Sequence, residues 1–243
     1  MKDVCILFVG DKYSTKHVVQ KRQQLDTKCS VPTELTVLTD DPATVMGLGL
    51  RDTRAVLVES AWNFTGRQLW WHKMFMFSDT IKWSSDVVYL DLDTIIVNDI
   101  AHFWTHNPGS FMICQDFNRK FIADYPVSNS SVMRFTPGAH SDLYRSFNDD
   151  GGRLIKQFRG DQDYVTYYFK HNPGKTWWPH DWCMSYKWEI LHGGVKHGCT
   201  EVTWPTDYYQ PDVNWIIPRD CSVVVFHGKP DPYDTQFGTV YTY

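Results

Sequence analysis

Residues 87–97 read Val-Val-Tyr-Leu-Asp-Leu-Asp-Thr-Ile-Ile-Val, which is the strongest strand-like run in the chain. Two carboxylates, Asp91 and Asp93, interrupt a run of residues that otherwise favours burial. Because buried unpaired carboxylates are costly, the pair needs a cation or strong hydrogen bonds. Residues two apart in an extended chain point to the same side, so we expect the two carboxylates to converge. Hard divalent cations prefer such oxygen ligands, and the stretch therefore predicts a cation site on a buried strand.

On either side of this stretch, apolar strand-like runs alternate with segments that carry apolar residues at helical spacing. Near-continuous apolar strands separated by helices are typical of a mostly parallel sheet that is flanked by helices. The sequence therefore predicts an α/β fold. The expected strands cover residues 4–9, 33–38, 54–58, 86–97, 110–114, 131–135 and 221–226, and the expected helices cover residues 15–25, 68–80, 141–147 and 161–169.

The C-terminal part of the chain is more irregular. Residues 171–220 are rich in Trp, Pro, Gly and His and show little periodicity. No stretch has the composition of a linker, so we expect one domain over residues 1–243 with elaborated C-terminal loops.

The composition excludes several classes of protein. A net charge of −4 gives no overall attraction to nucleic acid. The six cysteines form no C-x-x-C pair, which favours reduced thiols over a disulfide framework or a zinc site. No apolar stretch approaches the roughly 18 residues that a membrane span needs, and the first apolar run is typical of a core strand, not of a signal peptide. We therefore expect a cytoplasmic protein without a nucleic-acid partner or a membrane span.

Residues 89–93, Tyr-Leu-Asp-Leu-Asp, resemble the Asp-x-Asp segment of GT-A-fold glycosyltransferases, especially the retaining family that includes glycogenin and lipooligosaccharide galactosyltransferases. The resemblance implies a GT-A-like fold and sugar transfer from a nucleotide-sugar donor, with UDP as the expected nucleotide. The acceptor (a carbohydrate, a glycan or a protein) is not identified. By this likeness Asp91 and Asp93 hold Mn²⁺ or Mg²⁺ against the donor diphosphate, with Asp93 more directly engaged and Leu92 beside the donor. The same likeness implies a nucleotide-binding half over about residues 1–115 and a donor-sugar and acceptor half over about residues 116–243.

The last expected strand ends in His227-Gly228-Lys229, which resemble the family's residues at this point. By that likeness His227 completes the metal site, and Gly228 and Lys229 contact the diphosphate. Glycine allows a close backbone approach and lysine supplies a positive charge to phosphate. The family usually spaces the His and the Lys further apart. A structural role for His227 is the alternative.

A second group of candidates concerns the donor sugar. Gly160-Asp161-Gln162 resembles a family segment beside this sugar, which implies catalytic roles for Asp161 and Gln162. The alternative is that Asp161 only begins a helix, where acids are favourable. Lys73 lies in the expected helix before the acidic pair, where related enzymes carry a basic residue facing the donor; a solvated lysine is the alternative.

Further residues are assigned by the same likeness. Asp116, Asn129 and Ser130 fall in segments that line the donor-sugar pocket of the family, although they could also be simple turn formers. The loop after the first expected strand would bind the base and ribose. Its candidates are Val9, Gly10, Asp11 and Tyr13.

Two other functions remain open at the level of sequence. One is a phosphohydrolase of the haloacid-dehalogenase type with Asp91 as nucleophile, although its acidic pair normally follows the first strand. The other is a non-catalytic carbohydrate-binding protein. The Trp-rich stretch 177–215 would suit this second alternative, because flat aromatic faces stack on sugar rings.

Overall fold

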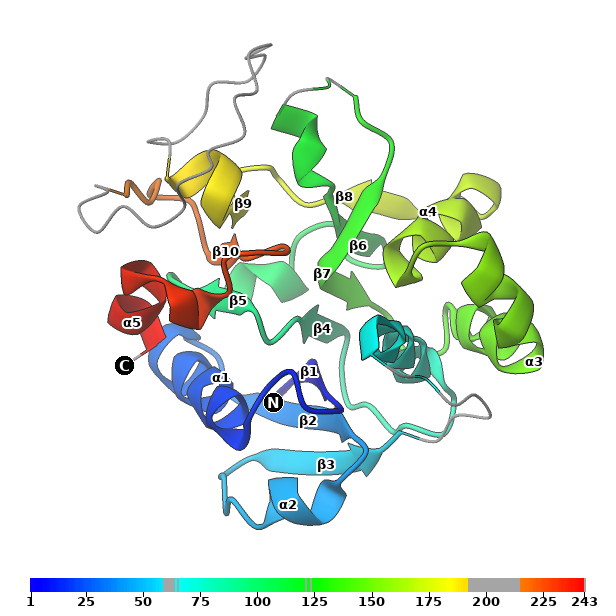
Figure 1. Ribbon diagram of the computed structural model, residues 1–243, viewed down its shortest axis with the longest axis horizontal. Helices are drawn as coiled ribbons and strands as arrows, with labels where there is room; N and C mark the ends of the chain where they lie inside the picture. The colour runs from blue at the N-terminus through cyan, green and yellow to red at the C-terminus, as the bar shows by residue number, and fades with distance from the viewer. Residues whose placement is uncertain (59–63, 65, 121, 123, 192–214, 243) are drawn as a thin grey trace.

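A computed structural model describes residues 1–58, 64, 66–120, 122, 124–191 and 215–242 (Figure 1). Among these residues, seven strands form one sheet in the order β3-β2-β1-β4-β7-β6-β8. Every neighbouring pair is parallel except those made by β7, which runs antiparallel to β4 and β6. The strands are β1 (Lys2–Phe8), β2 (Thr33–Thr39), β3 (Thr53–Leu57), β4 (Val87–Leu90), β6 (Phe111–Gln115), β7 (Ser128–Phe135) and β8 (Lys175–Trp177). The predicted α/β fold with a mostly parallel sheet is confirmed.

Alternation along β1 divides the core into two layers. Val4, Ile6 and Phe8 face one side of the sheet, where they pack with Val18 and Leu25 of α1 (Thr15–Lys28). On the other side, Cys5 and Leu7 belong to a second cluster, which also contains apolar residues of three helical elements. These elements are η1 (Gly66–Phe77), α3 (Ser141–Gln157) and α4 (Asp161–His171), which lie together on one side of the sheet in Figure 1.

A second sheet of three strands, in the order β5-β10-β9, lies within the described residues. It contains β5 (Thr94–Ile96), β9 (Cys183–Ser185) and β10 (Val223–Val225), with β10 antiparallel to β5 and parallel to β9. A third core cluster, which includes Ile95, Val224 and Phe237, joins this sheet to α5 (Gln236–Thr242). The remaining short helices are α2 (Pro42–Met46), η2 (Ala101–Trp104), η3 (Phe117–Lys120), η4 (Tyr186–Ile190) and η5 (Pro232–Asp234).

The predicted single strand over residues 86–97 is wrong, because the chain breaks at the acidic pair. The Thr94 backbone N–H and hydroxyl both donate to the carbonyl oxygen of Asp91, at 3.2 and 2.7 Å. This turn ends β4 and sends the chain into β5, which belongs to the other sheet. Asp91 and Asp93 therefore lie in the turn that connects the two sheets, not along an extended strand.

Several expected elements differ in extent. The predicted strand over 131–135 begins at Ser128, and a bulge in its pairing with β6 lies between Ile113 and Cys114. The predicted helix over 68–80 is a 3₁₀ helix, and α2 was not predicted. Of the irregular segment 171–220, residues 192–214 lie outside the described part of the chain.

Two further expectations concern cysteines and membrane spans. The five described cysteines are free thiols, while Cys199 lies outside the described residues. None of the helices in the described ranges has both the length and the apolar character that crossing a bilayer requires.

Candidate active site

The site forms where β1 and β4, which are parallel, end at the same edge of the sheet. The antiparallel strand β7 begins at this edge, and the Asp91 backbone N–H donates to the carbonyl oxygen of Ser131 at 2.8 Å. The fold thus brings together the loop after β1, the turn after β4 and the start of β7. Ligands of open α/β sheets bind at this edge.

Lys73 is the centre of a buried polar cluster. Its ammonium lies 2.9 Å from Asp91 Oδ1 and 3.5 Å from Asp161 Oδ2, and it donates to Ser130 Oγ at 3.2 Å. The Ser130 hydroxyl in turn donates to Asp161 Oδ2 at 2.5 Å. Burial alone would lower the pKa of Lys73, but the charges of Asp161 and Asp91 outweigh it and the pKa is raised. The charged Lys73 therefore connects three other predicted site residues, Asp91, Asp161 and Ser130.

The two carboxylates of the turn have different surroundings. Asp91 accepts a hydrogen bond from the Tyr89 hydroxyl at 2.7 Å. Burial would raise its pKa, but Lys73 and this hydrogen bond lower it. Asp93 accepts from the Tyr13 hydroxyl at 2.9 Å and from Lys12 at 3.3 Å. The pKa of Asp93 is raised by burial and by the charge of Asp91, so this carboxylate would gain from another cation.

The turn offers two partly exposed carboxylates, Asp91 and Asp93, whose negative charges repel each other. Oxygen ligands of this kind suit a hard divalent cation. His227 is not gathered with them. Among the described residues, no three side chains of His, Cys, Asp or Glu form a group that could hold a metal ion. In this structure the Nε2 atom of His227 lies 2.7 Å from Ser185 Oγ.

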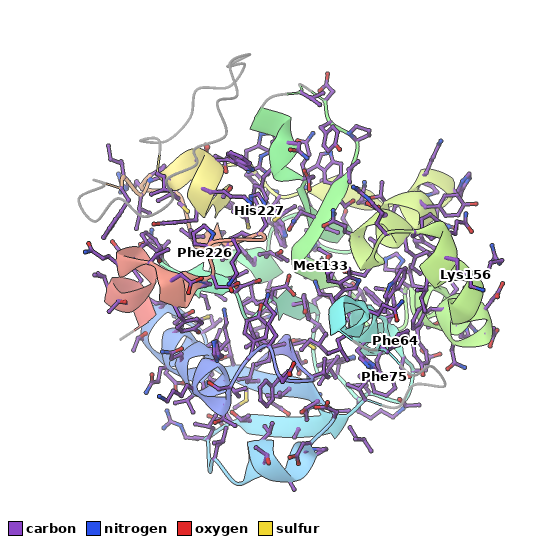
Figure 2. The ribbon with its side chains drawn as sticks, viewed as in Figure 1. Phe64, Phe75, Met133, Lys156, Phe226 and His227 are labelled. Atoms are coloured by element: carbon purple, nitrogen blue, oxygen red, sulfur yellow. The ribbon has the colours of Figure 1, made fainter. Side chains whose placement is uncertain are left out.

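His227 follows β10 and is labelled beside Phe226 in Figure 2. Its ring stacks on Phe117, with ring centroids 4.9 Å apart. Burial, followed by the nearby charges of Lys187 and Arg119, lowers the pKa of His227 to about 3. The imidazole is therefore neutral at physiological pH, which is the form that binds metals.

A buried ion pair between Arg119 and Glu189 holds Ser185, the residue that contacts the His227 imidazole. Glu189 Oε2 accepts from the backbone N–H of Ser185 at 2.6 Å, and Glu189 Oε1 lies 3.5 Å from Arg119. Arg119 also donates to the carbonyl oxygens of Gln115, His180 and Cys183. The position of Ser185, and hence the contact of its hydroxyl with His227, is fixed by this network.

Asp161 and Gln162 form the first turn of α4. Asp161 is buried and its pKa is raised by burial, although Lys73 and Ser130 act in the opposite direction. Gln162 is half-buried. Gly160, not Asp161, is the residue that caps this helix, so Asp161 is free to contact Lys73 and Ser130 through its side chain.

Other predicted residues are placed away from this cluster or turned from it. The Asn129 side chain accepts from the Ser131 N–H at 3.0 Å within β7, and Asp116 accepts from the Asn118 N–H at 2.9 Å. Burial raises the pKa of Asp116. Lys229 is 74% exposed and is paired with Asp231 and Asp234.

The loop after β1 closes over the acidic turn. Gly10 has a φ of 67°, and a β-carbon there would lie 2.5 Å from the Leu69 side chain, so glycine is required. Its N–H donates to Asp40 Oδ2 at 3.0 Å. Val9 and Leu92 are buried, whereas Asp11 is exposed.

Three lysines and a tyrosine at the site were not predicted. Lys12 reaches Asp93 and also lies 3.8 Å from Asp231, which connects the loops after β1 and β10. Lys21 is fully buried, donates to the carbonyl and hydroxyl oxygens of Thr94, and has a pKa that burial lowers to about 7. Its position between Val18 and Leu25 on the apolar face of a helix was the available signal. The others are Tyr89, whose hydroxyl contacts Asp91 two residues further on, and Lys187, which lies beside Gly228, a residue far along the chain.

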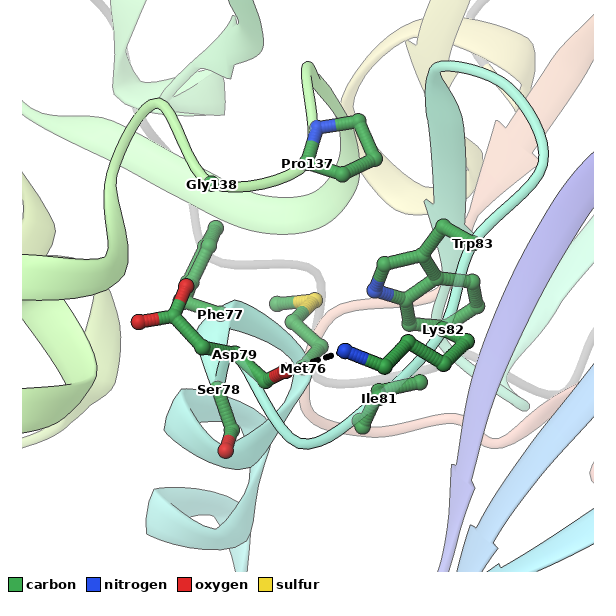
Figure 3. Close-up of a pocket in the computed structure, with 9 residues that line it drawn as sticks. All are labelled: Met76, Phe77, Ser78, Asp79, Ile81, Lys82, Trp83, Pro137 and Gly138. Atoms are coloured by element: carbon green, nitrogen blue, oxygen red, sulfur yellow. Dashed lines mark hydrogen bonds between the residues drawn. The ribbon is translucent and has the colours of Figure 1, made fainter.

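A shallow cavity of about 250 Å³ lies at the opposite edge of the sheet, before β4 begins (Figure 3). Its lining includes Ser78, Lys82, Trp83 and Gly138. Lys82 donates only to the carbonyl oxygen of Asp79 in this close-up, at 3.5 Å. This cavity is separate from the acidic turn and shares none of its residues.

Solved glycosyltransferases share this architecture, although the sequence matches no protein-family model and no curated protein. The galactosyltransferase LgtC, solved with donor and acceptor sugar analogues, aligns with a TM-score of 0.63 and 13% identity over 99% of this chain and 94% of its own. GlyE from Streptococcus pneumoniae TIGR4 aligns with a TM-score of 0.64 and 12% identity over 99% of this chain and 59% of its own. Mouse xyloside xylosyltransferase 1 gives a TM-score of 0.53 and 15% identity over 94% and 97% of the two chains. The chain therefore has the GT-A fold that the glycosyltransferases LgtC and GlyE adopt.

Proposed function

We propose that this protein is a metal-dependent glycosyltransferase that transfers a sugar from a nucleotide-diphosphate sugar to a carbohydrate, glycan or protein acceptor. One observation carries the proposal. On a glycosyltransferase fold, the acidic turn at the carboxyl edge of the sheet is joined through Lys73 to Asp161. UDP as the nucleotide and retention of anomeric configuration complete the proposal, as the family likeness implies. The proposal includes a cytosolic location, which the scattered cysteines of the sequence favour.

Asp91 and Asp93 are the residues that would hold Mn²⁺ or Mg²⁺. When bound, such an ion supplies positive charge that stabilises the departing nucleoside diphosphate. Ligation by His227 would require its Nε2 atom to leave Ser185 Oγ. That exchange is feasible on electrostatic grounds, because the imidazole is already neutral.

Side chains of the protein would stabilise and orient the donor sugar. Departure of the leaving group builds positive charge on the sugar ring, and the carboxylate of Asp161 can stabilise that charge. Lys73 and Ser130 hold Asp161 in place through contacts of 3.5 and 2.5 Å. Gln162, in the same helical turn, would orient the sugar. The acceptor hydroxyl would then attack the anomeric carbon from the face of the leaving group and give its proton to the departing diphosphate, which gives retention.

The proposal is tested by hydrolysis and transfer assays with a panel of nucleotide sugars, with and without Mn²⁺. We expect turnover with a UDP-sugar that depends on the metal. Asp91→Asn, Asp93→Asn and Asp161→Asn should each lower kcat by about 100-fold or more, because each removes charge at the reacting centre. Asp79→Asn, at the opposite edge of the sheet, is the matched control. The anomeric configuration of the product, measured by NMR, tests retention.

Metal-dependent turnover that is unchanged in both Asp91→Asn and Asp93→Asn would refute the assignment of the metal ligands. A protein that binds nucleotide sugars but shows no turnover with any donor and acceptor would instead be a carbohydrate-binding protein.

A further inference from the structure

Lys187 lies beside the loop that follows β10. It follows β9 by two residues, and Ser185 of β9 pairs with Val225 of β10 in a parallel register. The Lys187 Nζ atom lies 3.4 Å from the point that a β-carbon on Gly228 would occupy. Its ammonium is also 5.3 Å from the centre of the Trp188 ring. The lysine is half-buried and lies directly against the bare backbone of residue 228.

The loop at Gly228 is physically connected to the acidic turn. The backbone N–H of Phe226 donates to the carbonyl oxygen of Asp93 at 3.1 Å. Gly228 has a φ of 74°, a conformation that favours glycine, and its missing side chain leaves the backbone accessible to a ligand. A group bound beside Asp93 is therefore close to the loop that Lys187 covers.

The charges of the two nearby lysines are compensated very differently. No carboxylate in the described ranges lies within 4.0 Å of Lys187. Lys229, by contrast, is paired with both Asp231 and Asp234 and is largely exposed. Burial lowers the pKa of Lys187, and the charge of Asp116, which forms no ion pair with it, acts in the opposite direction. A half-buried ammonium that has no carboxylate beside it in the described part of the chain attracts an anion more strongly than an exposed one that is already paired.

We propose that Lys187, and not Lys229, supplies the ammonium that binds the diphosphate of the donor. This inference rests on the proposed function, because it assigns a residue to the donor of that same site. The ligand class is a nucleoside diphosphate, and the phosphate nearer the sugar would contact the Lys187 ammonium beside the exposed backbone at Gly228. Lys229 instead stabilises its own loop through Asp231 and Asp234.

Two measurements on binding test this inference. In the first, the wild-type protein with Mn²⁺ is acetylated at low reagent concentration, and each lysine is followed by mass spectrometry. UDP should protect Lys187 at least about fivefold and leave Lys229 unprotected, whereas uridine should protect neither. This measurement needs no variant and so does not depend on the folding of a variant.

In the second measurement, calorimetry gives the affinities of UDP and uridine for Lys187→Met and Lys229→Met, with Lys82→Met as a control. A charge-assisted contact with phosphate predicts that Lys187→Met binds UDP about 10- to 100-fold more weakly, with uridine unchanged. Lys229→Met should change the UDP affinity by less than about twofold. GDP, CDP and ADP with their nucleosides are measured in parallel, so the result does not depend on the base.

The outcomes separate the inference from the proposed function. If the wild-type protein binds a nucleoside diphosphate and Lys229→Met loses as much affinity as Lys187→Met or more, the inference is wrong and the proposed function stands. Protection of Lys229 in place of Lys187 has the same meaning. If the wild-type protein binds none of the four diphosphates, the proposed function fails, and the inference fails with it.

Discussion

Lys73 balances the charges of the candidate site. Its ammonium lies between two carboxylates that come from different elements, Asp91 after β4 and Asp161 at the start of α4. A buried ion pair adds little to stability compared with apolar packing, but removal of one partner leaves a buried charge without compensation. The side chain of Asp161 is 7% exposed and that of Asp91 is 20% exposed, so the greater cost falls on Asp161.

We therefore expect Lys73→Met to lower the free energy of unfolding by about 2–4 kcal/mol, as measured by urea unfolding at pH 7. The double variant Lys73→Met, Asp161→Asn should recover at least half of this loss, because it also removes the charge that is left unpaired. Lys82→Met, which alters an exposed lysine at the opposite edge of the sheet, is the control and should change little. A loss below about 1 kcal/mol in the single variant would show that the cluster is hydrated and not held by Lys73.

At the level of elements, the turn between β4 and β5 shows where the sequence stops being informative. The apolar runs of β1 and β2 predicted their strands because each contributes to one buried sheet. Residues 87–97 also fit a single strand by the same criterion. The break depends on hydrogen bonds from Thr94 to Asp91 and on the pairing of β5 with β10, which lies about 130 residues further along. The hydrophobic pattern of neighbouring residues does not indicate a strand partner so far away in the sequence.

The candidate site also contains residues that the sequence predicted and residues that it did not. Asp91 was predicted because a carboxylate within an apolar run needs a compensating partner, whereas Lys73 and Asp161 were assigned from the family resemblance. Lys12 and Lys187 could not be predicted from their neighbours. Their role depends on which loops the fold brings beside them, after β4 and after β10.

Arg134 shows how one element is held by a single side chain. It is fully buried in β7, and its guanidinium donates to four carbonyl oxygens in and after η2, those of Phe103, His106, Asn107 and Ser110. The distances range from 2.5 to 3.0 Å. The five donors of arginine fit this arrangement, whereas lysine has three donors at one point.

We expect Arg134→Lys to lower the free energy of unfolding by about 3 kcal/mol, because buried carbonyl oxygens lose their donors. Hydrogen exchange of the amides in residues 103–110 should accelerate more than exchange in β1. Arg153→Lys, on the exposed side of α3, should leave the urea midpoint at the wild-type value. Equal midpoints for both variants would contradict the structural role assigned to Arg134.

At the level of the whole molecule, the candidate site lies where the two sheets meet. The acidic turn connects β4 to β5. The backbone N–H of Phe226 donates to the carbonyl oxygen of Asp93, and Lys12 forms ion pairs with Asp93 and Asp231. A donor that contacts the turn and the loop after β10 would therefore add contacts to both sheets at once. Such a ligand stabilises the folded state by mass action.

UDP at about 100 times its Kd with Mn²⁺ should stabilise the protein by about 2.7 kcal/mol, which corresponds to a rise in Tm of roughly 5–10 °C. Removal of the metal with EDTA should abolish most of this rise. Asp91→Asn combined with Asp93→Asn should behave like the protein in EDTA, whereas Asp79→Asn should behave like the wild type. A rise that persists in EDTA would indicate nucleotide binding that does not depend on the acidic turn.

The antiparallel pairing of β5 with β10 also has a consequence for the order in which the chain assembles. Residues 94–96 emerge from the ribosome about 130 residues before their partners at 223–225. Until then, the first sheet can form but β5 presents an open edge. Contacts between residues so far apart in the sequence slow folding, and until they form the unpaired strand edge can pair with other chains. Nascent chains that stop before residue 223 should therefore depend on chaperones, and the binding centre should mature only after β10 has been synthesised.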